Sequence, residues 1–388
     1  MEIFRKLNRP VATSIGIFDL YKGIAMILIV FMHTKSLFPS FWIDRISNYN
    51  EDGIIKTLPY VRDLSFFYMP FLVIPLLFAV SLMPALFILS GYSLRKRKIE
   101  KSISQSIREL LKPYFTTVVL AVFLNSIIHY GTYRYWPGAV DESLKLLAGM
   151  ALGSSKTVQV GSFVIFANGP IWFLLGLFWA TVIFNALLNY VDEKKLIYYV
   201  FSISLLGWAL SYVKFTPFCI SQGLCGVIYV YIGYYLRRKK ILTESHERKQ
   251  ILMYTVAVIL PNIILLASGY ITQMADNIYS LGPVTYIENG LLGVVILYLF
   301  MRMDEFCTGK ISNLLRLIGR YSLYFLCIHS IEMVAVPWYD LAEKLIDNPI
   351  TDFLVIYCLR LGLIFVGCVL VVKTKRILAK RNPKSMRM

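Results

Sequence analysis

The sequence predicts an all-α, polytopic integral membrane protein with about ten transmembrane helices and both termini in the cytoplasm. Of its 388 residues, 57% are hydrophobic and only 16% are charged. Apolar runs of about 18 or more residues recur along the chain, as expected for helices that cross a bilayer. The Lys and Arg residues gather at alternate ends of these runs, which is the charge bias of cytoplasmic loops.

Ten apolar segments qualify as membrane spans. The second of them carries Pro70, Pro75 and Pro84, so it could be one broken helix or two short ones. Counting it as one helix keeps most Lys and Arg residues on the inner side, whereas splitting it would destroy that bias. We therefore expect one helix, kinked at its prolines. The predicted spans are 15–38, 65–94, 112–130, 169–191, 195–213, 218–236, 251–271, 288–303, 314–337 and 352–373.

The charge and cysteine patterns exclude several other classes. A net charge of +17 would suit a nucleic-acid surface if it lay on one folded domain. Here the charge is divided among inner loops, so we expect no nucleic-acid partner. The six cysteines show no metal-ligand spacing, and we expect no metal. The expected organisation is a single transmembrane domain over 1–388, with a short basic cytoplasmic tail at 374–388 and long outer loops at 39–64 and 131–168.

An acid, a base and an imidazole fall on one face of the first predicted helix. At about 100° per residue, His33 lies within roughly 20° of Lys22, and Asp19 falls on the same stripe. Leaving such side chains in lipid would cost several kcal/mol, so the stripe is expected to face the protein interior. Asp19 and Lys22 could be a structural ion pair. His33 could pack in the core, accept a proton, or act as a nucleophile.

Five segments, in order along the chain, resemble motifs of the acyltransferase 3 family of membrane acyltransferases. The family's first-helix signature is similar to FDLYKGIAMILIVFMH, with its acid, basic residue and histidine. The end of its second helix resembles PALFILSGYSLRKR, and the start of its third resembles SIRELLKPYF. Later family helices are similar to GPIWFLLGLFWA and LIGRYSLYFLCIHS. The resemblance covers nearly the whole chain.

The resemblance implies an O-acyltransferase that moves an acyl group, usually acetyl, from cytoplasmic acyl-CoA to a sugar hydroxyl. The acceptor would be a cell-surface or lipid-linked glycan met on the outer side of the membrane. By the same resemblance, His33 is the essential histidine and Lys22 its basic partner near the donor, with Asp19 as the acid of the pattern. The expected location is the cell membrane, as a multi-pass protein of a bacterial inner or plasma membrane. The oligomeric state stays open.

The loop after the second span is the expected donor site. Family members often carry Arg-x-x-Arg there, where this chain has Arg95 and Lys98, with Arg97 as the alternative second cation. These cations could bind the phosphates of acetyl-CoA or another acyl-CoA, or act only as positive-inside anchors. Gly91 would let another backbone approach closely, so that the loop could fold over a ligand. The candidate donor-binding residues are Lys22, Ser90, Gly91, Tyr92, Arg95, Arg97 and Lys98.

Candidates for binding the acceptor lie at the predicted outer helix ends. His329 and Glu332 share one helix face, where Glu332 could orient the imidazole or serve helix–helix hydrogen bonding. Trp136 belongs to an aromatic cluster that could stack on a sugar, although interfacial aromatic residues occur for structural reasons too. Trp172 and Asn168 lie at the start of the fourth span. They could border the acceptor, although a Trp at the membrane interface is again a structural alternative.

A transporter or flippase for a sugar or glycolipid is the alternative function. Ten spans and intramembrane charges suit that class as well. The sequence shows no internal repeat and no further acidic relay, and it places Lys22 and His33 on a single helix. These features favour the enzyme, and acyl transfer by the purified protein would separate the two classes.

Overall fold

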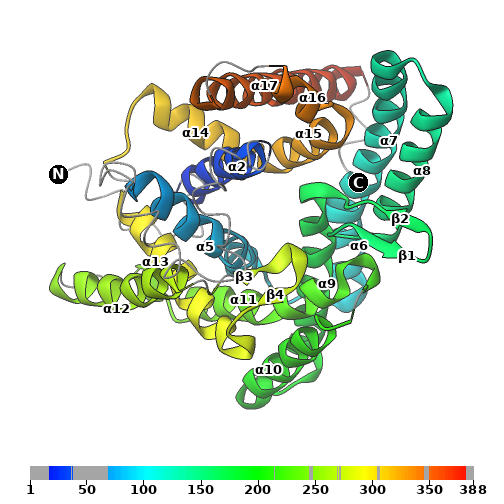
Figure 1. Ribbon diagram of the computed structural model, residues 1–388. Coiled ribbons are helices and arrows are strands. Elements are labelled where there is room, and N and C mark those ends of the chain that lie inside the picture. The colour runs from blue at the N-terminus through cyan, green and yellow to red at the C-terminus, as the bar shows by residue number, and fades with distance from the viewer. Residues whose placement is uncertain are drawn as a thin grey trace.

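The computed structural model describes residues 17–35, 37, 69–213, 215–243, 248–268, 270, 272–303, 306–344 and 349–381. Within these residues the protein is a bundle of α-helices with two small antiparallel hairpins (Figure 1). The predicted outer loop 39–64 lies outside the described residues. The predicted tail at 374–388 begins as helix, because the last helix continues to Arg381.

The helices follow the predicted spans closely. Those that match a predicted span are α2 (Ile17–Lys35), α5 (Met69–Ser93), α7 (Lys112–Tyr133), α9 (Trp172–Tyr190), α10 (Glu193–Leu210), α11 (Ile220–Arg238), α12 (Arg248–Ala267), α13 (Thr285–Met303) and α17 (Pro349–Arg381). The shorter helices are α6 (Ile99–Ser106), α8 (Trp136–Leu152), α14 (Lys310–Arg320), α15 (Ser322–Ala335) and α16 (Trp338–Glu343). Helix α5 runs through all three prolines of the second span, so the expectation of one helix is confirmed.

Six helical segments of the described chain are long and apolar enough to cross a membrane. Two further apolar helices, Leu77–Ser93 and Ser322–Ala335, are shorter. An all-α membrane protein is therefore confirmed, while the number of about ten spans and the cytoplasmic termini stay predictions. The six segments are Ile99–Tyr133, Gly169–Tyr190, Pro217–Arg238, Lys249–Leu266, Gly282–Met303 and Thr351–Lys375.

The segment 131–168 is the largest departure from the expected layout. The sequence predicts a loop there, but the structure has helix α8 and a hairpin of β1 (Val158–Val160) and β2 (Phe163–Ile165). Acidic and basic side chains interrupt this segment, so it forms no apolar run that a search for spans would find. Its buried residues nevertheless recur at helical spacing, which is the signal of an amphipathic helix packed on α7. They are Ala139, Ser143, Leu146, Gly149 and Met150.

The predicted span 314–337 is also divided. Helix α14 ends at Arg320 and α15 begins at Ser322, because Tyr321 between them adopts φ −102° and ψ 19°, which interrupts the helical path. A second small hairpin pairs β3 (Thr272–Gln273) with β4 (Ile278–Tyr279). The break at Tyr321 allows α14 and α15 to contact α2 separately.

Helix α2 lies inside the bundle, between α5 on one side and α14, α15 and α17 on the other (Figure 1). On the α5 side, a Cβ atom on Gly91 would lie 2.0 Å from the carbonyl oxygen of Val230 in α11. This glycine is therefore needed for the close approach of α5 and α11. The expectation that Gly91 admits another backbone is confirmed, and the backbone it admits is that of α11.

Candidate functional site

Helix α2 carries the three residues that the sequence placed on one stripe, and it presents them at its two ends. Asp19 is buried near the start of α2, where Lys22 Nζ lies 2.7 Å from Asp19 Oδ1. His33 lies near the other end, roughly 16 Å further along at about 1.5 Å per residue. The stripe therefore divides into an ionic end and an imidazole end.

At the ionic end, a second cation joins the Asp19–Lys22 pair. Arg320 Nε, at the end of α14, lies 3.6 Å from Asp19 Oδ2. The two helices meet so closely that a Cβ atom on Gly319 would lie 1.8 Å from the carbonyl oxygen of Asp19. One carboxylate is thus shared by two cations, which leaves a positive excess. The side chain of Lys22 is 29% exposed and that of Arg320 is 59% exposed, so both are open to a ligand.

The basic loop after α5 is held in place by side chains of α9. The backbone N–H of Arg97 donates to Asn185 Oδ1 over 3.0 Å. The carboxamides of Asn185 and Asn189 donate to the carbonyl oxygen of Arg97, each over 2.9 Å. Arg95 and Lys98 are exposed on either side of this anchor. The loop is therefore fixed through its backbone, and its cations stay available.

The loop belongs to the ionic end of α2. The ring of Tyr92 packs edge-on against that of Phe18 at the start of α2, with centroids 5.3 Å apart. Ser90 Oγ donates to the carbonyl oxygen of Leu86 within its own helix, so its hydroxyl has a structural partner. Arg237, at the end of α11, interacts electrostatically with Tyr92 and with Arg95.

Neither Arg237 nor Arg320 received a role from the sequence, since Arg237 follows the predicted span 218–236 and Arg320 lies inside the predicted span 314–337. The ionic end thus gains two cations that only the packing reveals, from α11 and from α14. In the structure each lies in the last turn of its helix, where a cation also complements the helix dipole.

At the other end of α2, His33 meets a second histidine. The rings of His33 and His329 have centroids 5.3 Å apart, with planes inclined at 51°. His329 comes from α15, so packing joins two residues that are far apart along the chain. The sequence treated His329 as a candidate for the acceptor side, and the structure brings it to the candidate catalytic histidine.

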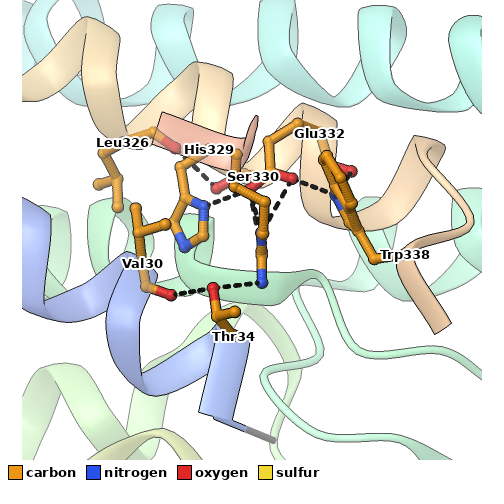
Figure 2. A network of polar contacts seen from close by, with 8 residues as sticks. Val30, Thr34, Leu326, His329, Ser330, Glu332 and Trp338 are labelled. Atoms are coloured by element: carbon orange, nitrogen blue, oxygen red, sulfur yellow. Dashed lines mark hydrogen bonds and ion pairs between the residues drawn. The ribbon is translucent and has the colours of Figure 1, made fainter. Parts of the chain in front are cut away.

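A polar network surrounds His329 (Figure 2). His329 Nδ1 lies 2.6 Å from Glu332 Oε1, and Arg360 Nη2 lies 2.9 Å from the same oxygen. Arg360 Nη1 donates to Thr34 Oγ1 over 3.2 Å. The indole N–H of Trp338 donates to the carboxylate of Glu332 and, over 3.1 Å, to its main-chain oxygen. The network therefore ties α2, α15, α16 and α17 together around one carboxylate.

The side chains of this network are shielded from solvent. The side chains of His329 and Arg360 are each 1% exposed, and that of Glu332 is 2% exposed. Arg360 also lies over the ring of Trp338, with its guanidinium carbon 5.6 Å from the ring centroid. Buried charges persist only when they are paired and hydrogen-bonded, and both conditions hold here. The sequence reading missed Arg360, although an arginine inside an apolar run is itself a signal of a functional partner.

The other candidates for acceptor binding lie apart from this network. Trp172 is buried and packs edge-on against Phe173. Asn168 is fully buried, with its carboxamide 3.4 Å from the hydroxyl of Tyr114. Trp136 is 57% exposed on α8 and packs edge-on against Tyr130. Of these three, Trp136 alone presents a free ring face at the surface.

Asn168 and Trp172 nevertheless flank a segment that packs on α15. The 3-10 turn Gly169–Ile171 contacts that helix, and a Cβ atom on Gly169 would lie 2.9 Å from the Met333 side chain. Met333 follows Glu332 directly in the chain. The start of α9 therefore supports the helix that carries His329. Within the described residues, no group of three or more His, Cys, Asp or Glu side chains is arranged to hold a metal ion.

Comparison with known families gives a match over nearly the whole chain. A family model described as an acyltransferase domain, that of the acyltransferase 3 family, matches residues 15–373. The match includes both ends of α2, the basic loop and the network around His329. Among curated proteins and solved structures, none matches the chain significantly. Because the family model covers nearly the whole chain, the protein belongs to the acyltransferase 3 family and is a membrane acyltransferase.

Proposed function

We propose that this protein is an O-acyltransferase that moves an acyl group, acetyl in the first instance, from cytoplasmic acyl-CoA to a hydroxyl of a cell-surface or lipid-linked glycan. The observation that carries the proposal is the contrast between the two ends of α2. One end gathers exposed cations around Asp19 and Lys22, and the other places His33 against His329. A phosphate-bearing donor with a long arm would need both.

The ionic end would bind the phosphates of acyl-CoA. Lys22 and Arg320 share a single carboxylate, so their combined charge is only partly neutralised. Arg95, Lys98 and Arg237 add further cations at the same end of the bundle. Hydrogen bonds from such cations to phosphate are among the stronger ones in proteins. The bound donor needs no metal in this scheme.

The thioester would then reach the imidazole end. The rise from Lys22 to His33, roughly 16 Å along the helix axis, approximates the length of an extended pantetheine arm. A neutral imidazole can accept a proton from a hydroxyl or attack a carbonyl near neutral pH. His33 would therefore take part in the acyl transfer itself. In the predicted topology this end of α2 faces outward, where a glycan would be met.

The acceptor would approach from the outer side, past exposed aromatic rings. Trp136 presents such a ring at the start of α8, next to Tyr130. An amphipathic ring can stack on the apolar face of a sugar. The cell membrane, a bacterial inner or plasma membrane, is the proposed location, and lipids would cover the apolar outer faces of α7 and α12.

Two measurements test the proposal. Purified protein in lipid nanodiscs, given acetyl-CoA and glycan-bearing membranes from cells that lack the protein, should release CoA and transfer the acetyl group. Cells with and without the protein should differ in glycan mass by one or more acyl groups. Transport of a sugar or glycolipid without any acyl transfer would contradict the proposal and would favour the transporter.

A further inference from the structure

We infer that His329 is a second catalytic residue of the proposed reaction: it is the general base for the acceptor hydroxyl, while His33 carries the acyl group. This inference rests on the proposed function and divides that function between two residues. From the sequence alone, His33 could be either a base or a nucleophile. The geometry around His329 points to one assignment.

The hydrogen bonds of His329 indicate which of its ring nitrogens carries the proton. Its Nδ1 lies 2.6 Å from Glu332 Oε1. Glu332 Oε1 also accepts a hydrogen bond from Arg360 Nη2 over 2.9 Å, so the carboxylate is paired with a guanidinium. A carboxylate oxygen that already accepts from a guanidinium acts as an acceptor toward the imidazole as well, so we place the proton between the two residues on Nδ1. Nε2 of the neutral ring must then carry the lone pair, as in a base oriented by a carboxylate.

The lone pair of His329 Nε2 lies on a buried atom. His329 Nε2 is buried and has no hydrogen-bond partner among the described residues. Buried polar atoms are almost always hydrogen-bonded, so one that is not needs an explanation. A substrate hydroxyl that donates to Nε2 would supply the missing partner. The ring of His33, 5.3 Å away between centroids, would place an acyl group beside that hydroxyl.

A chain of hydrogen bonds links the helices that carry His33 and His329. Arg360 joins Glu332 on α15 to Thr34 on α2, and Thr34 directly follows His33. Thr34 Oγ1 in turn donates to the carbonyl oxygen of Val30 over 2.7 Å, which fixes its rotamer (Figure 2). The network therefore sets the position of one histidine relative to the other. We assign Glu332, Arg360 and Thr34 as positioning residues.

The reaction balances as two displacements. In the first, a ring nitrogen of His33 attacks the thioester carbon, the C–S bond breaks, and CoA leaves with the proton released by the acylated ring. In the second, the acceptor oxygen attacks the acyl carbon while His329 Nε2 takes its proton. The C–N bond breaks, its electron pair returns to the ring of His33, and His329 passes the proton to that ring. The sum is thioester plus alcohol giving ester plus thiol.

The test uses the full-length protein in nanodiscs, with acetyl-CoA as donor and hydroxylamine as a nucleophile that needs no general base. The variant His329→Gln should release about one CoA per protein and then stop, because the acyl group stays on His33. Mass spectrometry of the peptide that contains His33 should find that acyl group. Adding hydroxylamine should restore steady CoA release to within about threefold of the wild-type rate, whereas acetyl transfer to glycan should stay at least about 100-fold down.

Three controls sharpen the test. His33→Ala should show no release of CoA with or without hydroxylamine. His129→Gln changes a histidine of α7 that pairs with Glu142 of α8, and it should behave as the wild type does. Glu332→Gln should lose glycan transfer, and hydroxylamine should restore its release of CoA. General structural damage would not give this response.

Two outcomes overturn the inference. Glycan transfer by His329→Gln above a tenth of the wild-type rate would show that His329 is not the base. Absence of the acyl group from the His33 peptide, in a variant that no longer transfers to glycan, would show that His33 does not carry it. A wild-type protein that never releases CoA from acetyl-CoA would instead refute the proposed function, and the inference with it.

Discussion

The two ends of α2 bind charge in opposite ways. At the ionic end, Asp19 is shared by Lys22 and Arg320, whose side chains remain partly exposed and carry a positive excess. At the imidazole end, Glu332 is shared by Arg360 and His329, and all three side chains are dry and fully partnered except at His329 Nε2. One carboxylate organises each end, but the surroundings differ.

The two ends are therefore suited to different tasks. Cations at the surface can bind a ligand without any rearrangement of the protein core. Their excess positive charge attracts an anion such as a phosphate. Buried, hydrogen-bonded groups are preorganised, so they can hold a reacting atom and a proton in fixed positions. The first arrangement suits binding and the second suits chemistry. Substitutions at the two ends should therefore fail in different ways.

The largest effect is expected at the imidazole end. His33→Ala should lower acetyl transfer to glycan by at least about 100-fold, because the loss of a catalytic base or nucleophile has effects of two to four orders of magnitude. The rate of transfer by purified protein in nanodiscs measures this. His129→Ala is the matched control and should keep the wild-type rate. More than a tenth of that rate in His33→Ala would remove the histidine from the chemistry.

A large effect on stability is expected from the buried arginine. Arg360→Ala should lower the free energy of unfolding by about 3–5 kcal/mol, because it leaves the carboxylate of Glu332 buried with its cation removed. Arg320→Ala removes the more distant of the two cations that share Asp19 and should change stability by at most about 1 kcal/mol, because Lys22 stays in place and Arg320 is exposed. Unfolding of both variants in the same detergent makes the comparison. Equal losses of unfolding free energy in the two variants would mean that the carboxylates of Asp19 and Glu332 have similar surroundings.

A smaller effect, confined to donor use, is expected from Lys22. Lys22→Ala should raise the KM for acetyl-CoA about tenfold, since the loss of one charge-assisted contact of about 1.4 kcal/mol has that effect. The change in kcat should be smaller, and Lys22→Arg should be milder because the charge is kept. Lys195→Ala, an exposed lysine of α10, serves as the control. A drop in kcat with unchanged KM would move Lys22 from binding to chemistry.

The smallest effect is expected from the aromatic surface of α8. Trp136→Ala should lower transfer to glycan only a few-fold, the effect of losing one stacking contact of about 0.5–1.5 kcal/mol. It should leave CoA release to hydroxylamine unchanged, because hydroxylamine needs no contact with a sugar. Wild-type transfer to glycan in this variant would assign Trp136 to the membrane interface alone.

The sequence predicted the helical membrane class and the stripe on α2, because both depend on local periodicity and composition. The Asp19–Lys22 pair is one turn of one helix, so it could be foreseen. The meeting of His33 with His329 depends on how α15 packs against α2, and no spacing along the chain specifies that. Arg360 was visible as a charge in an apolar run, but its partner Glu332 belongs to another helix.

Helix α8 and the break at Tyr321 were missed for a related reason. A search for long apolar runs finds helices surrounded by lipid, and it overlooks an amphipathic helix whose buried residues face a neighbour. Ser143 of α8 shows this, since its hydroxyl lies 2.7 Å from that of Ser126 on α7. The charges of α14 likewise lie within a run that the sequence treated as a single span.

In the proposed mechanism the ionic end of α2 faces the cytoplasm and the imidazole end faces outward, so that acyl groups cross between them. Lys101→Cys, after the basic loop, and Gln159→Cys, in β1, place exposed reporters near opposite ends of the bundle. A membrane-impermeant thiol reagent on intact cells should label Gln159→Cys and not Lys101→Cys, with the unsubstituted chain as the control for native cysteines. Labelling of Lys101→Cys from outside would invert the protein, put His33 at the cytoplasmic end, and contradict transfer across the membrane.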